Sequence, residues 1–395
     1  QKMSAPNGEE GIPPVSTDDA KAAGGPVPDQ VALKRSDVIK KKLLKHHLVL
    51  GLLFGLVFGW TVPSPGLFWG SIIPKNEWVS VSNLHVFIIF LISGSGLKTT
   101  EIKKALSEWK AVIYGIFTIL ILTACMGGVM TRIPLSMPEL AYGLGVFCCV
   151  PTTMSSGVIL VGQGDGNTSL GLLLTVATSL LGVITIPFML FLAFSSLEGD
   201  TSININVGTM VYKLALFVAL PLGIGKCVRH SHPRVPVFRT VNKLKFKLTS
   251  SLLLIMIPWM KVSSSVDKMN LLSVELVVAC ILLGALMHLV FLAVNLFVAK
   301  FLLELEQPEQ IALTILGSQK TLGITVTVVE FLPDSLGAKG VILVPCIFAH
   351  FVQILIDGIL ISHTDKIFWK GSFKDCLAKK RKQADTDEAG KKEIE

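Results

Sequence analysis

The chain of 395 residues is 51% hydrophobic and only 16% charged, with a mean hydropathy of +0.64. This composition is too apolar for a soluble domain and predicts a polytopic membrane protein. The formal net charge of +8 does not indicate a nucleic-acid partner, because the basic residues cluster in the tails and in a few short loops. The seven cysteines are scattered without the spacing of a metal site or of a disulfide framework.

The two ends of the chain differ from its apolar middle. Residues 1–44 have little apolar periodicity and predict a disordered tail that ends in a group of lysines directly before the first apolar stretch. Residues 364–395 form a second tail of basic and acidic residues, whose basic cluster we expect to contact anionic lipid. Between them, residues 45–363 form the predicted transmembrane domain.

Ten apolar stretches are long enough to cross a bilayer core of about 30 Å, which takes roughly 20 residues per helix. We therefore expect an all-α fold of ten transmembrane helices. The predicted spans are 47–63, 78–96, 111–131, 139–163, 168–194, 207–228, 248–265, 273–303, 307–332 and 339–363.

The charges of the predicted loops give the orientation. The loops at 97–110 and 229–247 are rich in lysine and arginine, whereas the segment 195–206 contains neither. The positive-inside rule therefore places the two basic loops, and both termini, in the cytoplasm. The N-terminal tail has neither the apolar core of a signal peptide nor the acid-poor composition of a transit peptide. The expected location is the plasma membrane or a membrane of the secretory pathway.

The predicted spans divide into two halves of five, at about residues 45–200 and 205–363. An odd number of spans per half means that the halves enter the membrane in opposite orientations, as in an inverted repeat. Polar residues interrupt the fourth span of each half, at 149–157 and at 317–323. Paired interruptions at corresponding positions indicate a transporter binding site near the middle of the membrane.

The first interruption combines a proline with hydroxyl side chains. Pro151 lacks an N–H and would free carbonyls upstream, near Phe147 and Cys148. The freed carbonyls and the hydroxyls suit a monovalent cation, while the start of the following half-helix suits an anionic group. The alternative is a proline kink whose hydroxyls bond the carbonyls four residues back. The candidate ligands of the substrate or ion here are Pro151, Thr152, Thr153, Ser155 and Ser156.

The second interruption contains a lysine deep in an apolar span. Lys320 costs roughly 2.5–3.5 kcal/mol near a helix centre, so it should face protein or water and have a partner. Its ammonium either takes the place of a coupling cation or holds an anionic substrate; the alternative is a lysine that snorkels to the surface. The candidate residues here are Gly317, Ser318, Gln319, Lys320 and Thr321, and a monovalent cation would bind at Thr152, Thr153, Ser156 and Gln319.

The tenth span carries three polar residues on one helix face, at spacings of three and four. Asp357 is a candidate counter-ion for a basic group, or a solvated residue near the inner end of the span. His350 either relays protons or bonds a neighbouring carbonyl, and Gln353 lies between the two. His288 receives no role, and the chain shows no constellation of catalytic residues, so we do not expect an enzyme.

Four segments carry a family resemblance: 90–98, 150–157, 164–167 and 317–322. They resemble the bile acid:sodium symporter superfamily, and most of all its cotransporter-7-like branch. The resemblance implies ten helices in two inverted five-helix repeats, with discontinuous fourth and ninth helices that cross beside the substrate. Where sodium-coupled members have an acidic residue before the Gly-x-Gln and an asparagine after it, this chain has Ile315 and Lys320. That change of two charge units disfavours sodium at this place.

The expected function is therefore secondary active transport of a small organic anion by alternating access. Sodium or a proton is the candidate coupling ion, and no other cofactor is expected. The alternative, which the resemblance also allows, is a membrane regulator of calcium entry or of secretory-pathway homeostasis. The expected partners are the anion and membrane lipids, with no nucleic acid; the sequence does not define an oligomeric state.

Overall fold

The structure is a computed structural model that describes residues 35–73, 80–96, 108–153, 156–195, 205–232 and 234–368. The chain divides into two compact units, residues 1–47 and 48–395. Most of both predicted tails, and Ser155, lie outside the described residues. Every regular element among the described residues is a helix, which confirms the all-α class.

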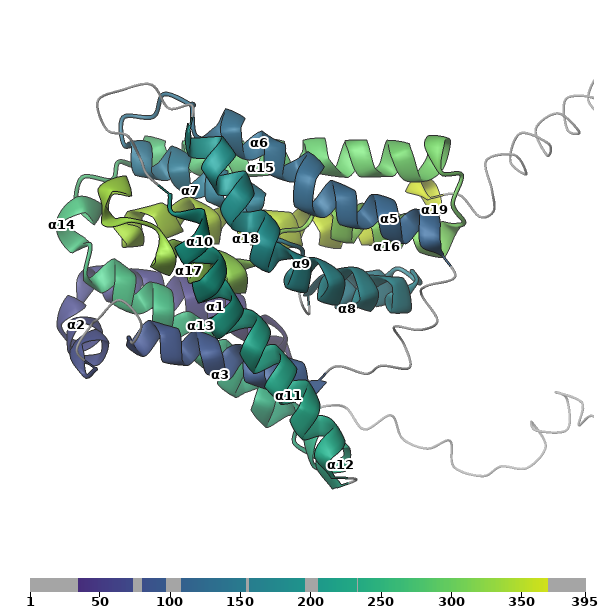
Figure 1. Ribbon diagram of the computed structural model, residues 1–395, viewed down its shortest axis with the longest axis horizontal. Helices are drawn as coiled ribbons and strands as arrows, with labels where there is room; N and C mark the ends of the chain where they lie inside the picture. Colours follow the sequence, from purple (N-terminus) through teal and green to yellow (C-terminus); the bar gives the residue numbers. More distant parts are fainter. Residues whose placement is uncertain are drawn as a thin grey trace, which may run out of the picture. The chain divides into compact units, whose positions relative to one another are not determined.

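Twenty-two helical segments are described, several of which join end to end (Figure 1). Up to residue 195 they are α1 (Arg35–Thr61), α2 (Pro63–Ser71), α3 (Val81–Gly96), α5 (Trp109–Phe117), η2 (Thr118–Leu122), α6 (Thr123–Met130), α7 (Pro138–Cys149), α8 (Ser156–Gln163) and α9 (Thr168–Ser195). The others are α10 (Val207–Leu214), η3 (Ala215–Ala219), α11 (Leu220–Ser231), α12 (Arg234–Val241), α13 (Lys243–Ser263), α14 (Val266–Met269), α15 (Val274–Phe297), η4 (Val298–Leu302), α16 (Gln307–Ser318), α17 (Leu322–Phe331), η5 (Asp334–Leu336), α18 (Lys339–Ile361) and α19 (Thr364–Ile367).

The membrane character of the chain is confirmed by the length and apolarity of these helices. Seven described segments can cross a membrane: Trp109–Met130, Thr168–Ser195, Val207–Ser231, Lys243–Ser263, Val274–Leu302, Gln307–Phe331 and Lys339–Ile361. Leu50–Thr61 and Pro63–Ser71 are long and apolar enough to cross a membrane only when taken together, with a bend of 99° between them. Val81–Gly96 is a shorter apolar helix. Each predicted span overlaps at least one described helix, but their total number stays a prediction.

The segment α16–α17 is the most enclosed of the spanning helices. Within its most apolar stretch of 18 residues, 94% is buried, against 28% for the corresponding stretches of Val207–Ser231 and Lys243–Ser263. A helix surrounded by other helices presents little surface to lipid, so polar residues in it can be satisfied only by protein or by enclosed water. The second predicted interruption therefore lies in the spanning segment that is most deeply buried within the protein.

Two sets of helices pack within the larger unit (Figure 1). In the first set α11 packs on α3, and α13 packs on α2 and α3. Gly94 of α3 and Gly225 of α11 each lie against a backbone carbonyl of the other helix, so that any side chain there would collide with it. This close approach is typical of membrane helices that meet through small residues. In the second set α7 packs on α6 and α18, and α15 packs on α16 and α18.

A widened turn interrupts the span Trp109–Met130. Residues Thr118–Leu122 (η2) form a π-helical turn, in which the peptide N–H of Thr123 bonds the carbonyl of Thr118 five residues back. Such turns are rare and are frequently found at functional sites. The turn lies where α5–η2–α6 faces the interruptions of α7–α8 and α16–α17, so it belongs to the site described next.

The two predicted interruptions are confirmed as breaks between helices. The first break follows α7, where Val150 takes an extended conformation (φ −84°, ψ 157°), as expected for a residue that precedes a proline. The second break follows α16, where Gln319 (ψ 147°) and Thr321 (ψ 127°) are also extended. The second break contains no proline, so contacts with other helices must hold it open.

Candidate functional site

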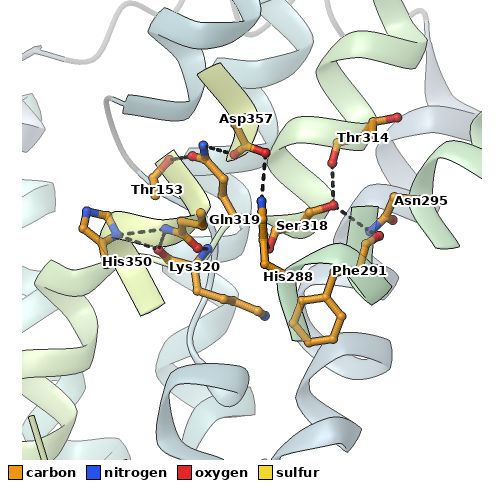
Figure 2. Close-up of polar contacts among 11 residues, drawn as sticks. Thr153, His288, Phe291, Asn295, Thr314, Ser318, Gln319, Lys320, His350 and Asp357 are labelled. Carbon is orange, nitrogen blue, oxygen red and sulfur yellow. Dashed lines mark hydrogen bonds and ion pairs between the residues drawn. The ribbon is translucent and has the colours of Figure 1, made fainter. Parts of the chain in front are cut away.

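The two breaks touch one another through backbone and side chains. The backbone N–H of Thr321 donates to the carbonyl of Pro151 at 2.9 Å. Thr153 donates its hydroxyl to Oε1 of Gln319 at 2.6 Å (Figure 2). The structure therefore brings the two sets of predicted site residues together. We call this region the crossing, defined by residues 150–153 and 318–321.

The first break is held mainly by its neighbours. Thr153 accepts the backbone N–H of Gly157 at 2.9 Å, which caps the start of α8, and its carbonyl accepts the hydroxyl of Thr175 from α9 at 3.2 Å. The hydroxyl of Thr152 is fully buried and has no hydrogen-bond partner among the described residues. Ser156 begins α8 and is partly buried.

Two carbonyls of the first break meet the second break. Those of Val150 and Pro151 receive the donors from the second break, while the freeing of carbonyls near Phe147 and Cys148 stays a prediction. The chain is already extended at Val150, so these later carbonyls turn away from the helix axis and toward the other break.

The second break is held by a side chain of α18. Gln353 accepts the backbone N–H of Lys320 with Oε1 at 3.0 Å and donates Nε2 to the carbonyl of Lys320 at 2.7 Å. The same amide lies 2.8 Å from Nδ1 of His350, which itself lies 3.3 Å from the Lys320 carbonyl. An amide that binds both groups of one peptide replaces the partners that an unbroken helix would supply. Two of the predicted supporting residues thus maintain the break.

The side chain of Lys320 is fully buried, and its ammonium binds three oxygens. These are the carbonyl of Ile119 in the π-helical turn at 2.8 Å, the hydroxyl of Thr123 at 2.7 Å and the carbonyl of Val150 at 2.9 Å. The ammonium also lies 6.0 Å from the centre of the Phe291 ring, toward which the side chain extends in Figure 2. The ammonium therefore does not reach the surface, as a snorkelling lysine would.

Asp357 is fully buried on α18 and accepts from two side chains (Figure 2). Nε2 of Gln319 lies 2.5 Å from one carboxylate oxygen, and Nε2 of His288 lies 2.8 Å from the other. Nδ1 of His288 faces the carbonyl of Ser318 at 3.3 Å, so an imidazolium would donate at both ring nitrogens. The sequence analysis gave His288 no role, and this is corrected: His288 is the basic partner of Asp357. Asp357 is buried, so the alternative of a solvated carboxylate is wrong.

The side-chain amide of Asn295 connects the second break to α15 and to the π-helical turn. Asn295 of α15 donates to the hydroxyl of Ser318 at 3.4 Å and accepts the hydroxyl of Thr118 at 2.9 Å. A Cβ at Gly317 would lie 2.7 Å from Oδ1 of Asn295, so only glycine lets the two helices approach this closely. His288 and Asn295, seven residues apart, lie on one face of α15; that spacing in an apolar span was the signal that could have identified them.

Four charged residues away from the crossing contact other parts of the protein. Lys261 and Glu330 form an ion pair at 2.6 Å. Arg229 and Arg239, in the predicted inner loop, donate to the carbonyl and the hydroxyl of Ser95 at 2.9 and 3.0 Å at the end of α3. Burial lowers the pKa of Arg239, and the charge of Arg229 adds to this shift.

The predicted cation site is partly engaged in contacts within the protein. Thr153 and Gln319 bind each other, and Gln319 also binds Asp357. Among the four predicted ligands, only the hydroxyl of Thr152 is both fully buried and without a hydrogen-bond partner in the part of the chain that the structure describes. A cation at this place would therefore have to replace bonds that already join the two breaks. The carbonyls and hydroxyls are nevertheless the kind of ligand that a hard monovalent cation takes.

Comparisons with known proteins agree on one family. The model of the SBF-like CPA transporter family matches residues 46–366. The probable sodium/metabolite cotransporter BASS4, chloroplastic, of Arabidopsis thaliana is 33% identical over 340 residues, which cover 85% of this chain and 74% of the relative. The sodium/bile acid cotransporter 7 of Danio rerio is 23% identical over 330 residues, which cover 81% and 94%. The protein of the same name from Mus musculus is 24% identical over 327 residues, which cover 80% and 92%.

Proposed function

Because the chain belongs to the SBF-like CPA transporter family, we propose that it moves a small organic anion across a membrane by secondary active transport with alternating access. The resemblance predicted from the break motifs is thereby confirmed. The names of the relatives describe sodium/metabolite and sodium/bile acid cotransporters, which supports a solute transporter. The anionic nature of the solute and the coupling of its transport to an ion gradient are parts of the proposal.

The observation that carries the proposal is the contact between two unwound segments, one of which lies in the most enclosed spanning segment, α16–α17. Unpaired backbone groups cost several kcal/mol in hydrocarbon, so breaks of this kind survive only where protein or enclosed water satisfies them. Here Thr321 binds Pro151, and Gln319 binds Thr153. Such a pair of broken helices supports a substrate site near the middle of the membrane.

The proposed architecture has ten spans in two inverted five-helix repeats. The breaks α7–α8 and α16–α17 would then be the discontinuous fourth and ninth spans, which cross. The set containing α3, α11 and α13 would be a panel, and the set containing α7, α15, α16 and α18 would be the core that moves against it. The packing of α3 with α11 and α13, and of α18 with α7 and α15, supports this division, and the two sets meet where α13 contacts α18.

The proposed anionic nature of the substrate rests on the helix starts at the crossing. Helices α8 and α17 both begin there, at Ser156 and Leu322. The start of a helix carries a partial positive charge and unpaired N–H groups, which favour an anionic group. The Asp357 carboxylate already has two partners, so it need not oppose the anion.

The proposed orientation places both termini on the side of the two basic loops. The positive-inside rule supports this, because the basic residues are concentrated at 97–110 and 229–247. The plasma membrane and the secretory pathway remain the expected locations, whereas the plant relatives carry the word chloroplastic in their names. A fluorescent fusion at each end, read by organelle markers and by protease protection, tests both points.

Uptake into liposomes tests the transport function. Purified protein is reconstituted and exposed to a panel of labelled carboxylates, sulfonates and sulfate esters, with and without sodium and a proton gradient. We expect saturable uptake of at least one anion class by the native chain. The variant Gln319→Leu, which cannot bind Thr153 or Asp357, should lose it, whereas Thr178→Val, outside the crossing, should retain it. The absence of uptake for every anion would contradict the proposal.

The same variant separates transport from a regulatory role in calcium entry or secretory homeostasis. If Gln319→Leu abolishes uptake but still restores the phenotype of a knockout cell, the phenotype does not depend on transport. If it fails in both assays while reaching the membrane at the native level, transport accounts for the phenotype.

A further inference from the structure

The ammonium of Lys320 sits in a socket of three oxygens: the carbonyl of Ile119, the hydroxyl of Thr123 and the carbonyl of Val150. We propose that this socket is a monovalent-cation site that the protein fills with its own lysine, so that the anion moves without a dissociable cation at this position. The inference rests on the proposed transport function and specifies its ion requirement.

The hydrogen bonds of Lys320 leave no donor for a substrate. An ammonium has three N–H groups, and the three oxygens of the socket accept one each, at 2.7–2.9 Å. The side chain is fully buried. To contact an anion, Lys320 would have to abandon at least one of these bonds inside an apolar region. Its geometry therefore favours the role of a resident cation over that of an anion contact.

The ligands of the socket are of the type that binds a small cation. Two are backbone carbonyls, one is a hydroxyl, and the ring of Phe291 lies 6.0 Å from the ammonium. Both carbonyls come from irregular backbone, because Ile119 lies in a π-helical turn and Val150 is the first, extended residue of the first break. The chain thus departs from regular helix at two places to build the socket.

The position of the negative charges agrees with a filled site. Asp357 is bound by His288 and Gln319 and does not neutralise Lys320. Ile315, one turn before Gln319, is fully buried and apolar. A free cation in the socket would therefore find only neutral ligands, whereas the covalently attached ammonium is retained without a carboxylate. This is the chemical reason to place a lysine there.

Truncation of Lys320 tests the proposal by cation binding as well as by transport. In Lys320→Ala the socket is emptied, and the purified variant should bind sodium, potassium or methylammonium. At a cation concentration about tenfold above the dissociation constant, its apparent melting temperature should rise by roughly 2–4 °C relative to choline. The native protein, and Lys320→Met, in which an uncharged chain fills the space, should show no such rise.

Transport provides the second readout. We expect uptake by the native chain to be the same in sodium and in choline. Uptake by Lys320→Ala should be lost in choline and restored at least tenfold by a cation that fits the socket. Lys320→Met should be inactive in both sodium and choline. The double variant Lys320→Ala/Thr123→Val, which lacks the hydroxyl ligand, should lose the melting shift and the restored uptake.

Several results would overturn the proposal. A sodium-induced melting shift of the same size in the native protein would mean that the cation binds elsewhere. A folded Lys320→Ala that binds none of the three cations would mean that the socket is not a cation site. The same conclusion would follow if Lys320→Ala fails to fold in the presence of each of the three cations while Lys320→Met is stable. If no variant and no native protein transports any anion but the melting shift appears, the transport function fails and the cation site stands.

Discussion

The two helix breaks meet at the crossing, but they are maintained in different ways. The first break supplies acceptors: the carbonyls of Val150 and Pro151 receive the ammonium of Lys320 and the N–H of Thr321. The second break supplies these donors and has its own support from α18, where Gln353 binds both backbone groups of Lys320. A proline breaks the first helix, whereas tertiary contacts break the second.

This difference implies an order of dependence. If α18 no longer holds the second break, the donors for the first break are displaced as well. If a contact of the first break alone is lost, the second break retains Gln353 and the carboxylate of Asp357. Substitutions on α18 should therefore cost more stability than substitutions on α9, and they should disturb both breaks.

The largest effect is expected from Asp357→Ala. This change leaves Gln319 and His288 without their shared acceptor in a buried region. Removal of one partner of a buried pair typically costs about 3–5 kcal/mol of unfolding free energy. Unfolding in mixed micelles measures the loss. Asp357→Asn, which keeps one acceptor oxygen, should lose clearly less; an equal loss in both variants would mean that the bonds to Gln319 and His288 are not what stabilises the region.

Gln353→Leu should have the next largest effect. It leaves the N–H of Lys320 unsatisfied, at about 1–3 kcal/mol for a buried group, and it removes the nearer of the two side chains that lie beside the Lys320 carbonyl. The matched control is His350→Leu, because His350 lies 3.3 Å from the same carbonyl and does not bind the N–H. Thermal unfolding in detergent should rank Gln353→Leu well below His350→Leu in stability, and the reverse order would remove Gln353 as the support of the second break.

The smallest effect is expected from Thr175→Val on the first break. Thr175 donates to the carbonyl of Thr153 at 3.2 Å and also bonds Gly171 in its own helix at 2.8 Å. Loss of the contact should cost about 1 kcal/mol. Thr178→Val, whose hydroxyl bonds Leu174 of its own helix, should cost less in the same assay. If Thr175→Val is as destabilising as Gln353→Leu, the two breaks do not differ in the way described.

Local sequence features predicted much of the site. Pro151 and the polar residues around Lys320 located both breaks, since each pattern lies within one short segment of an apolar span. The spacing of His350, Gln353 and Asp357 placed them on one face of α18, and all three face the second break or its neighbours. Periodicity along one helix was sufficient for these predictions.

Contacts between helices distant in the sequence were less accessible. His288 lies 69 residues from Asp357, and Ile119 lies 201 residues from Lys320. A backbone carbonyl such as that of Ile119 has no signature in the sequence at all. The sequence therefore predicted that Lys320 has a partner but not which one, because the direction of a carbonyl cannot be seen in a sequence.

The π-helical turn at Thr118–Leu122 has a consequence for how this protein is aligned with its relatives. A turn that closes over five residues holds one residue more than a turn that closes over four, and each residue rotates a helix by about 100°. A homologue with a single-residue deletion between Phe117 and Thr123 should have a regular helix there, with its carbonyls rotated away from the neighbouring break. In an alignment, homologues with a one-residue gap in that interval should therefore lack this arrangement, and homologues without the gap should have it.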